Sequence, residues 1–174
     1  YDKAANLYLE LAERDYAPAQ NNLGSMLEDG EGLVQDFGAA LKWYRKGASQ
    51  GYLPSYTRLG FLYYFGKGVQ KNNNEAFRWM HKAAVQGWPT SQRVLGVFYL
   101  RGEGVSQDYL EGMKWSLKAA NQGDADAQYN VGEIFFYGLG VSQNYEKALK
   151  WFGEAANQGH TNSQVMLGGL YEEG

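Results

Sequence analysis

The sequence predicts an all-α protein built from repeated helix pairs, and three periodic features predict it. Gly-X-Gly occurs four times, and each copy begins 36 residues after the previous one, at residues 30, 66, 102 and 138. A tryptophan follows the second glycine by 11 residues every time, as Trp43, Trp79, Trp115 and Trp151. Apolar residues with helical spacing occupy the stretches between these markers. A fixed period of this length indicates repeated supersecondary units.

The repeat divides the whole chain into units. Four complete units fit residues 17–52, 53–88, 89–124 and 125–160. Residues 1–16 match the second half of a unit, and residues 161–174 match the first half. We therefore predict a single repeat domain over residues 1–174. Because the first residues look like the interior of a helix and show no signal-peptide pattern, we expect a piece of a longer protein.

The first helix of each unit is predicted at 18–29, 54–65, 90–101, 126–137 and 162–173. In unit one, Ala19, Gly24 after Leu23, and Leu27 lie on one face because their spacing is close to four residues. Glycine inside a helix costs about 0.5–1 kcal/mol relative to alanine. Its recurrence predicts a close approach of another helix. The Gly-X-Gly segment then ends the helix, since glycine readily adopts the left-handed conformation.

The second helix begins at Asp36, Asn72, Asp108 and Asn144, which are good N-cap residues. Glu75 and Glu111 follow two of these caps at the spacing of a capping box. Small residues and one tryptophan form the apolar stripe, which in unit one is Ala40, Trp43, Gly47 and Ala48. The pattern predicts tight antiparallel packing with the tryptophan as a bulky plug. These helices are predicted to end at Gly51, Gly87, Gly123 and Gly159.

The repeat closely resembles the Sel1-like repeat family, a relative of the tetratricopeptide repeats. Unit three carries the pattern best, in Leu95-Gly96, Tyr99, Gly102, Gly104-Val105, Asp108, Trp115, Ala119-Ala120 and Gly123. The departures are minor: Leu33, Gly47, Leu11, Gly112 and Asp15. The resemblance implies a right-handed superhelical solenoid that serves as an adaptor in protein complexes, with the first helices lining its concave face. It favours a bacterial periplasmic, envelope or secreted location and leaves the cytoplasm open.

Composition excludes several classes of site. The chain has 174 residues, a net charge of -3 and no cysteine, so disulfides, catalytic thiolates and Cys-ligated zinc are excluded. Without clustered basic residues we expect no nucleic-acid partner. Without a run of about 20 apolar residues we expect no membrane insertion. His81 and His160 lie in different units, so we expect no metal site, cofactor or catalytic triad, and assign both to exposed or helix-terminal positions.

Catalysis is not expected, although one alternative stays open. The acidic residues Glu28, Asp29 and Glu31 are interpreted as a solvated helix end. In the alternative, the chain is an enzyme or enzyme subunit acting on cell-envelope substrates with carboxylates from Glu28, Glu133 or Glu172. A further alternative is a structural or self-associating spacer, because the half units leave apolar helix faces uncapped at both ends.

Aromatic residues exceed what the repeat pattern uses, and on the first helices they fall on one stripe with arginines. Aromatic and arginine side chains are the usual anchors of binding hot spots. We predict that a partner peptide or domain binds here, with Arg93 and Arg101 meeting a carboxylate. For Phe61 and Phe65, packing between neighbouring first helices is the alternative. The predicted partner-binding residues are Phe61, Tyr64, Phe65, Arg93, Val97, Leu100, Arg101, Tyr129, Glu133, Phe136 and Tyr137.

Overall fold

The computed structural model describes residues 2–172, and the side chains of residues 3–170. Every regular element in this range is an α-helix, which confirms the predicted fold class. The helices are α1 (Asp2–Glu13), α2 (Ala17–Asp29), α3 (Phe37–Ser49), α4 (Leu53–Phe65), α5 (Asn73–Ala84), α6 (Pro89–Arg101), α7 (Tyr109–Ala120), α8 (Ala125–Tyr137), α9 (Tyr145–Asn157) and α10 (Thr161–Glu172). Each first helix begins one residue before its predicted start. The side chain of Glu172 lies outside the described residues.

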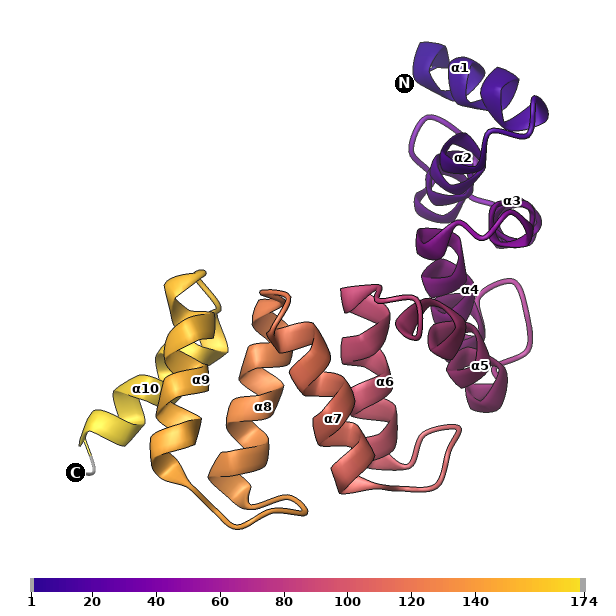
Figure 1. The fold of residues 1–174 in the computed structure, drawn as a ribbon. Helices are drawn as coiled ribbons and strands as arrows, with labels where there is room; N and C mark the ends of the chain where they lie inside the picture. Colours follow the sequence, from indigo (N-terminus) through magenta and orange to yellow (C-terminus); the bar gives the residue numbers. More distant parts are fainter. Residues whose placement is uncertain (1, 173–174) are drawn as a thin grey trace. The chain divides into compact units, whose positions relative to one another are not determined.

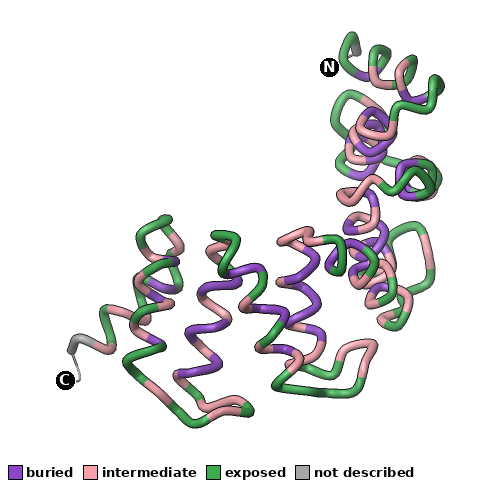
Figure 2. Tube along the Cα trace, in the orientation of Figure 1, coloured by how far each residue is buried: buried purple, intermediate pink, exposed green. Residues whose placement is uncertain are grey.

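The helices form two larger compact units, each with two complete helix pairs: the first unit is residues 2–86 and the second unit is residues 87–172. In the first unit α2 packs on α3 and α4 on α5, and in the second α6 packs on α7 and α8 on α9 (Figure 1). Each pair is one repeat. Buried residues lie mainly along the helices and exposed ones mainly along the connecting loops (Figure 2). The single domain over residues 1–174 stays a prediction.

The helix pairs approach closely at the predicted glycines. A Cβ atom on Gly24 would lie 2.7 Å from the ring of Tyr44, and one on Gly60 would lie 2.7 Å from Cε of Met80. The equivalent partner of Gly132 is Phe152. Tyr44, Met80 and Phe152 are all fully buried. The prediction that tryptophan is the plug is therefore wrong, because the residue after each tryptophan fills this position.

Three of the four repeat tryptophans instead have a lysine over the indole face, and Trp43 packs on small residues. Trp43 is half-buried against the cluster of Ala12, Ala19 and Leu23. The ammonium group of Lys46 lies 4.2 Å from the centre of one Trp43 ring. The same lysine–tryptophan contact recurs at the next two repeats, for Lys82 on Trp79 at 4.3 Å and Lys118 on Trp115 at 4.0 Å. A cation over an indole face is electrostatically favourable.

The loops between paired helices have a common construction. Gly30, Gly66, Gly102 and Gly138 end the first helices with φ between 68° and 72°. The predicted N-caps are confirmed, since the side chains of Asp36, Asn72, Asp108 and Asn144 each accept a backbone hydrogen bond from the next helix. The backbone N–H of each cap donates to a carbonyl of the first helix, for example Asp36 to Leu27 at 2.9 Å. Because these cap N–H groups are engaged, only one of the two bonds of each predicted capping box forms. The cap side chain accepts from the backbone of Glu75 or Glu111, but the carboxylates of these residues pair with Arg78 and Lys114.

A glutamine contact joins consecutive repeats, and the sequence analysis missed it. Nε2 of Gln128 donates to the carbonyl of Ala120 at 3.3 Å, and its Oε1 accepts from Gln158 at 2.8 Å. Gln20 makes the equivalent bonds in the first unit, to Ala12 at 3.1 Å and from Gln50 at 2.8 Å. Both Gln20 and Gln128 are buried. Glutamine recurs at this repeat position as Gln20, Gln92, Gln128 and Gln164, and this recurrence could have predicted the contact from the sequence.

Candidate partner-binding groove

Three of the predicted binding residues lie on α4, in the first unit, and form an aromatic cluster there. The rings of Phe61 and Phe65 stack with centroids 6.2 Å apart, and the Tyr64 ring meets Phe65 edge-on at 5.0 Å. Phe61 is half-buried, whereas Phe65 is 60% exposed. Phe61 and Phe65 thus contact each other one turn apart on the same helix.

Arg93, on α6 in the second unit, is engaged within the chain. Its Nε lies 3.3 Å from Oδ1 of Asp124, and its Nη2 lies 3.5 Å from Oδ2 of Asp126. Oδ1 of Asp126 also lies 3.4 Å from Nε2 of His160. These contacts link α6 to the N-terminal ends of α8 and α10. Arg93 therefore has carboxylate partners of its own and is a weak candidate for binding one from a partner protein.

Two predicted residues on α8 contribute to packing inside the second unit. The ring of Phe136 lies 5.5 Å from that of Tyr145 and 6.4 Å from that of Phe152. The ring of Tyr129 lies 5.6 Å from Phe152 and 4.9 Å from His160. Tyr137 differs, because 58% of it is exposed. Of these aromatics, Tyr137 is the one most available to a partner.

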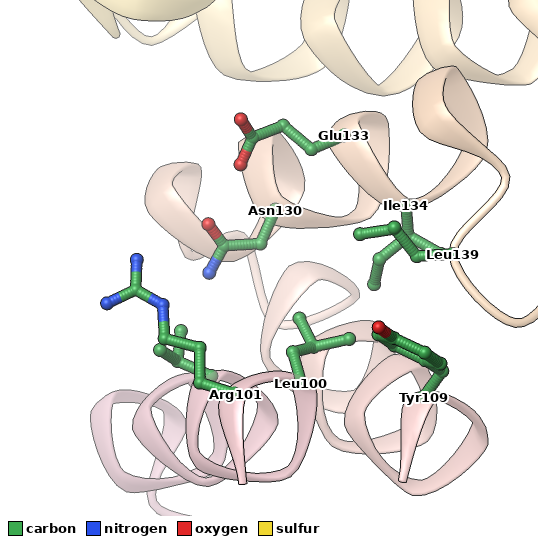
Figure 3. Close-up of a pocket in the computed structure, with 8 residues that line it drawn as sticks. Leu100, Arg101, Tyr109, Asn130, Glu133, Ile134 and Leu139 are labelled. Atoms are coloured by element: carbon green, nitrogen blue, oxygen red, sulfur yellow. The ribbon is translucent and has the colours of Figure 1, made fainter. Parts of the chain in front are cut away.

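A cavity of about 240 Å³ lies between α6 and α8, and we call it the α6–α8 groove. In Figure 3 Arg101, Asn130 and Glu133 gather at one end of the groove, and Leu100, Tyr109, Ile134 and Leu139 at the other. The structure brings four predicted residues together here, Val97, Leu100, Arg101 and Glu133, and adds four that sequence reasoning missed. The lining residues are Val97, Leu100, Arg101, Tyr109, Asn130, Glu133, Ile134 and Leu139.

Leu139 was detectable from the sequence. It is the middle residue of the fourth Gly-X-Gly, where the other three copies have Glu31, Lys67 and Glu103. An apolar residue at a position that is otherwise charged is an irregularity in the repeat. Leu139 lines the apolar end of the groove together with Tyr109.

The polar end of the groove carries two opposite charges. The Tyr129 hydroxyl donates a 2.8 Å hydrogen bond to Oε1 of Glu133. Burial, together with this bond, raises the pKa of Tyr129 to about 12, so the phenol stays a neutral donor near pH 7. The side chain of Arg101 is 67% exposed, and its guanidinium lies 3.9 Å from Glu103, beyond hydrogen-bond reach. Among the described residues no ion pair joins Arg101 to Glu133.

Glu28 is not part of a solvated helix end, so that interpretation is corrected. It is buried, and its Oε2 accepts a 2.8 Å hydrogen bond from the Tyr44 hydroxyl. Arg58 lies 3.7 Å and Lys67 3.5 Å from its oxygens. A carboxylate enclosed by a phenol and two cations has the surroundings of a structural ion, which speaks against the proposed catalytic use of Glu28.

One serine–histidine–aspartate contact exists, but its geometry is that of a helix cap. Nδ1 of His160 lies 2.9 Å from Oγ of Ser163 and accepts the backbone N–H of Ser163 at 3.2 Å, while Nε2 faces Asp126. Ser163 is fully buried, so its hydroxyl cannot reach a substrate. His160 thus has the predicted helix-terminal role. Over the described part of the chain, no three metal-ligating side chains converge and no helix could span a bilayer.

Comparison with protein-family models matches the Sel1 repeat at residues 17–52, 53–88, 89–124 and 125–160. These bounds are the same as those of the four predicted units. The chain belongs to the Sel1 repeat family. The all-helical fold with 36-residue repeats is that of Sel1 repeat solenoids.

Solved Sel1 repeat structures are similar over nearly all of the chain. A Sel1 repeat protein from Oxalobacter formigenes is 34% identical with a TM-score of 0.91, covering 98% of this chain and 68% of its own. A protective antigen of uropathogenic Escherichia coli with an SLR fold is 34% identical with a TM-score of 0.88, covering 99% of this chain. This chain spans only 38% of that antigen.

A more distant likeness is to an immunity protein from Pseudomonas aeruginosa. It is 27% identical with a TM-score of 0.65, covering 91% of this chain and 58% of its own. A comparison with curated proteins found no match.

Proposed function

We propose that this Sel1 repeat chain is a protein-interaction scaffold that holds a segment of a partner protein in the α6–α8 groove. The Sel1 repeat fold is commonly a protein-interaction scaffold. The observation that carries the proposal is the groove itself, in which an apolar end and a charged end adjoin. Pockets that bind ligands combine apolar walls with a few polar groups that fix orientation.

The groove offers two kinds of contact to a partner segment. A bulky apolar side chain fits the end formed by Leu100, Tyr109 and Leu139. The exposed guanidinium of Arg101 donates to a partner carboxylate in a bidentate geometry. The exposed ring of Tyr137 adds apolar contact area on the same helix as Glu133.

Selection from a random-peptide display library on the immobilised chain tests this function. The affinity of an enriched peptide is then measured for wild type, Leu139→Glu and Arg101→Glu. We expect each substitution to weaken binding by about tenfold or more, because a loss of about 1.4 kcal/mol at a hot spot is tenfold. Leu139→Glu should fold normally, since Glu31 and Glu103 occupy the equivalent position in other repeats.

Arg78→Glu is the matched control. Arg78 lies on a second helix, α5, and its side chain is 72% exposed, close to the 67% of Arg101. The charge change is the same, yet binding should be unaffected. The proposal fails if no peptide is enriched, or if enriched peptides bind wild type, Leu139→Glu and Arg101→Glu equally.

A further inference from the structure

The two charges at the polar end of the groove are placed for a ligand. Arg101 is a donor-only group and Glu133, when ionised, an acceptor-only group. They stand on the facing helices α6 and α8, with the amide of Asn130 beside them (Figure 3). Because no ion pair joins them among the described residues, neither charged group neutralises the other.

Glu133 is held in a fixed position. Its carboxylate accepts from the Tyr129 hydroxyl at 2.8 Å, and the Tyr129 ring is itself packed between Phe152 and His160. Glu133 is half-buried, and within the described part of the chain the hydrogen-bond partner of its carboxylate is the neutral Tyr129 hydroxyl. A partly desolvated carboxylate whose one hydrogen-bond donor is neutral attracts a cation more strongly than a fully hydrated one does.

The combination of an arginine and a glutamate at these two positions is found at the α6–α8 groove and not at the equivalent place in the first unit. In the first unit, the positions equivalent to Arg101 and Glu133 are Asp29 on α2 and Phe61 on α4. An acid and an aromatic ring there cannot reproduce a facing cation and anion. The charge pattern is thus a property of the α6–α8 groove and not of the repeat.

We infer that the α6–α8 groove selects a partner segment that carries an acidic and a basic side chain close to one bulky apolar side chain. The partner's carboxylate pairs with Arg101, its cation pairs with Glu133, and its apolar side chain fills the Leu100–Tyr109–Leu139 end. Complementary charges set the orientation of a bound segment and reject segments whose charges are reversed. This inference rests on the proposed function and adds the chemistry of the partner.

A reciprocal charge exchange tests the inference. The probe is a peptide enriched on the wild-type chain, together with a second peptide in which its acidic and basic residues exchange places. Wild type should bind the first peptide about tenfold or more tightly than the second, since like charges face each other in the mismatched pair. The double variant Arg101→Glu/Glu133→Arg should reverse this preference.

A milder variant keeps the test valid if the double variant fails to fold. Glu133→Gln retains an oxygen that can accept from Tyr129 and removes only the charge. It should weaken the first peptide several-fold, and the loss should vanish for a peptide whose basic residue is replaced by glutamine. Arg78→Glu/Glu75→Arg, which exchanges an exposed ion pair on α5, should leave both affinities unchanged.

The outcomes separate this inference from the proposed function. Peptides that bind in the groove but show no charge preference, or keep the same preference in the double variant, overturn the inference and leave the scaffold function standing. Failure to enrich any peptide overturns both.

Discussion

The hydroxyl of Tyr44 donates a 2.8 Å hydrogen bond to the carboxylate of Glu28, and so joins the two helices of the first full repeat inside its core. Burial and the adjacent Glu28 raise the pKa of Tyr44 well above its usual range, so the phenol remains protonated and able to donate. The same tyrosine ring fills the space left by Gly24. One side chain thus closes the helix pair and satisfies a buried charge.

Removing that hydroxyl should destabilise the fold. Tyr44→Phe keeps the ring against Gly24 and leaves the buried Glu28 with Arg58 and Lys67 at 3.5 Å or more. The lost bond to a buried ion should cost about 1–3 kcal/mol. Urea unfolding measures the change. Tyr16→Phe is the control, because Tyr16 is 54% exposed, and equal midpoints for the two variants would contradict the structural role of Tyr44.

The pKa of Tyr129 predicts a loss of stability at high pH. Burial and the bond to Glu133 raise this pKa from 10.0 to about 12. Above pH ~10 the unfolded chain releases a proton that the folded chain retains, so the free energy of unfolding falls as the pH rises from about 10 towards 12. Below pH ~10 the contribution is fully present.

Tyr129→Phe isolates this contribution. Urea midpoints are compared at about pH 9 and about pH 11 for wild type and the variant, and the wild type should lose more stability between them. Tyr44, whose pKa is also raised, is present in both proteins and cancels in the comparison. Equal losses would show that Tyr129 titrates alike in the folded and unfolded chains.

Two glycines of the second unit should respond oppositely to alanine. Gly132 is in close contact with the ring of Phe152, whereas a Cβ on Gly153 would meet nothing within 4 Å. Gly132→Ala should cost about 1–3 kcal/mol by overpacking. Gly153→Ala should add up to about 1 kcal/mol of helix stability. Thermal or urea unfolding checks both, and a stabilising Gly132→Ala would mean that α8 and α9 can separate without cost.

The glutamine contact between repeats should contribute measurably to stability. Gln128→Ala removes the bonds to Ala120 and Gln158 at a buried position and should cost about 1–3 kcal/mol. The control is Gln143→Ala. The exposed side-chain amide of Gln143 donates a hydrogen bond to the Phe136 carbonyl at 2.7 Å, and water can replace it there. Similar urea midpoints for the two variants would contradict a stabilising role for the buried glutamine contact.

The repeat period made much of the fold predictable. Four glycines with left-handed φ at 36-residue intervals end the first helices, and four N-caps begin the second ones, because both depend on the conformation of a few neighbouring residues. The irregular stripe pointed to Val97, Leu100, Arg101 and Glu133, which the groove does bring together. It also included Arg93 and Phe136, which contact groups of their own chain.

By itself, the sequence determined the helices, their ends to within one to three residues, and the positions where two helices approach, since periodic spacing and local backbone preference decide these. Only the tertiary structure decided which side chain fills each close approach: Tyr44 and not Trp43 meets Gly24, because a rotation of one residue on a helix changes the face presented by about 100°. It likewise decided that Glu28 is buried and that Arg101, Glu133 and Leu139 line one groove. Those relationships depend on residues brought together from different helices and loops, which no local pattern specifies.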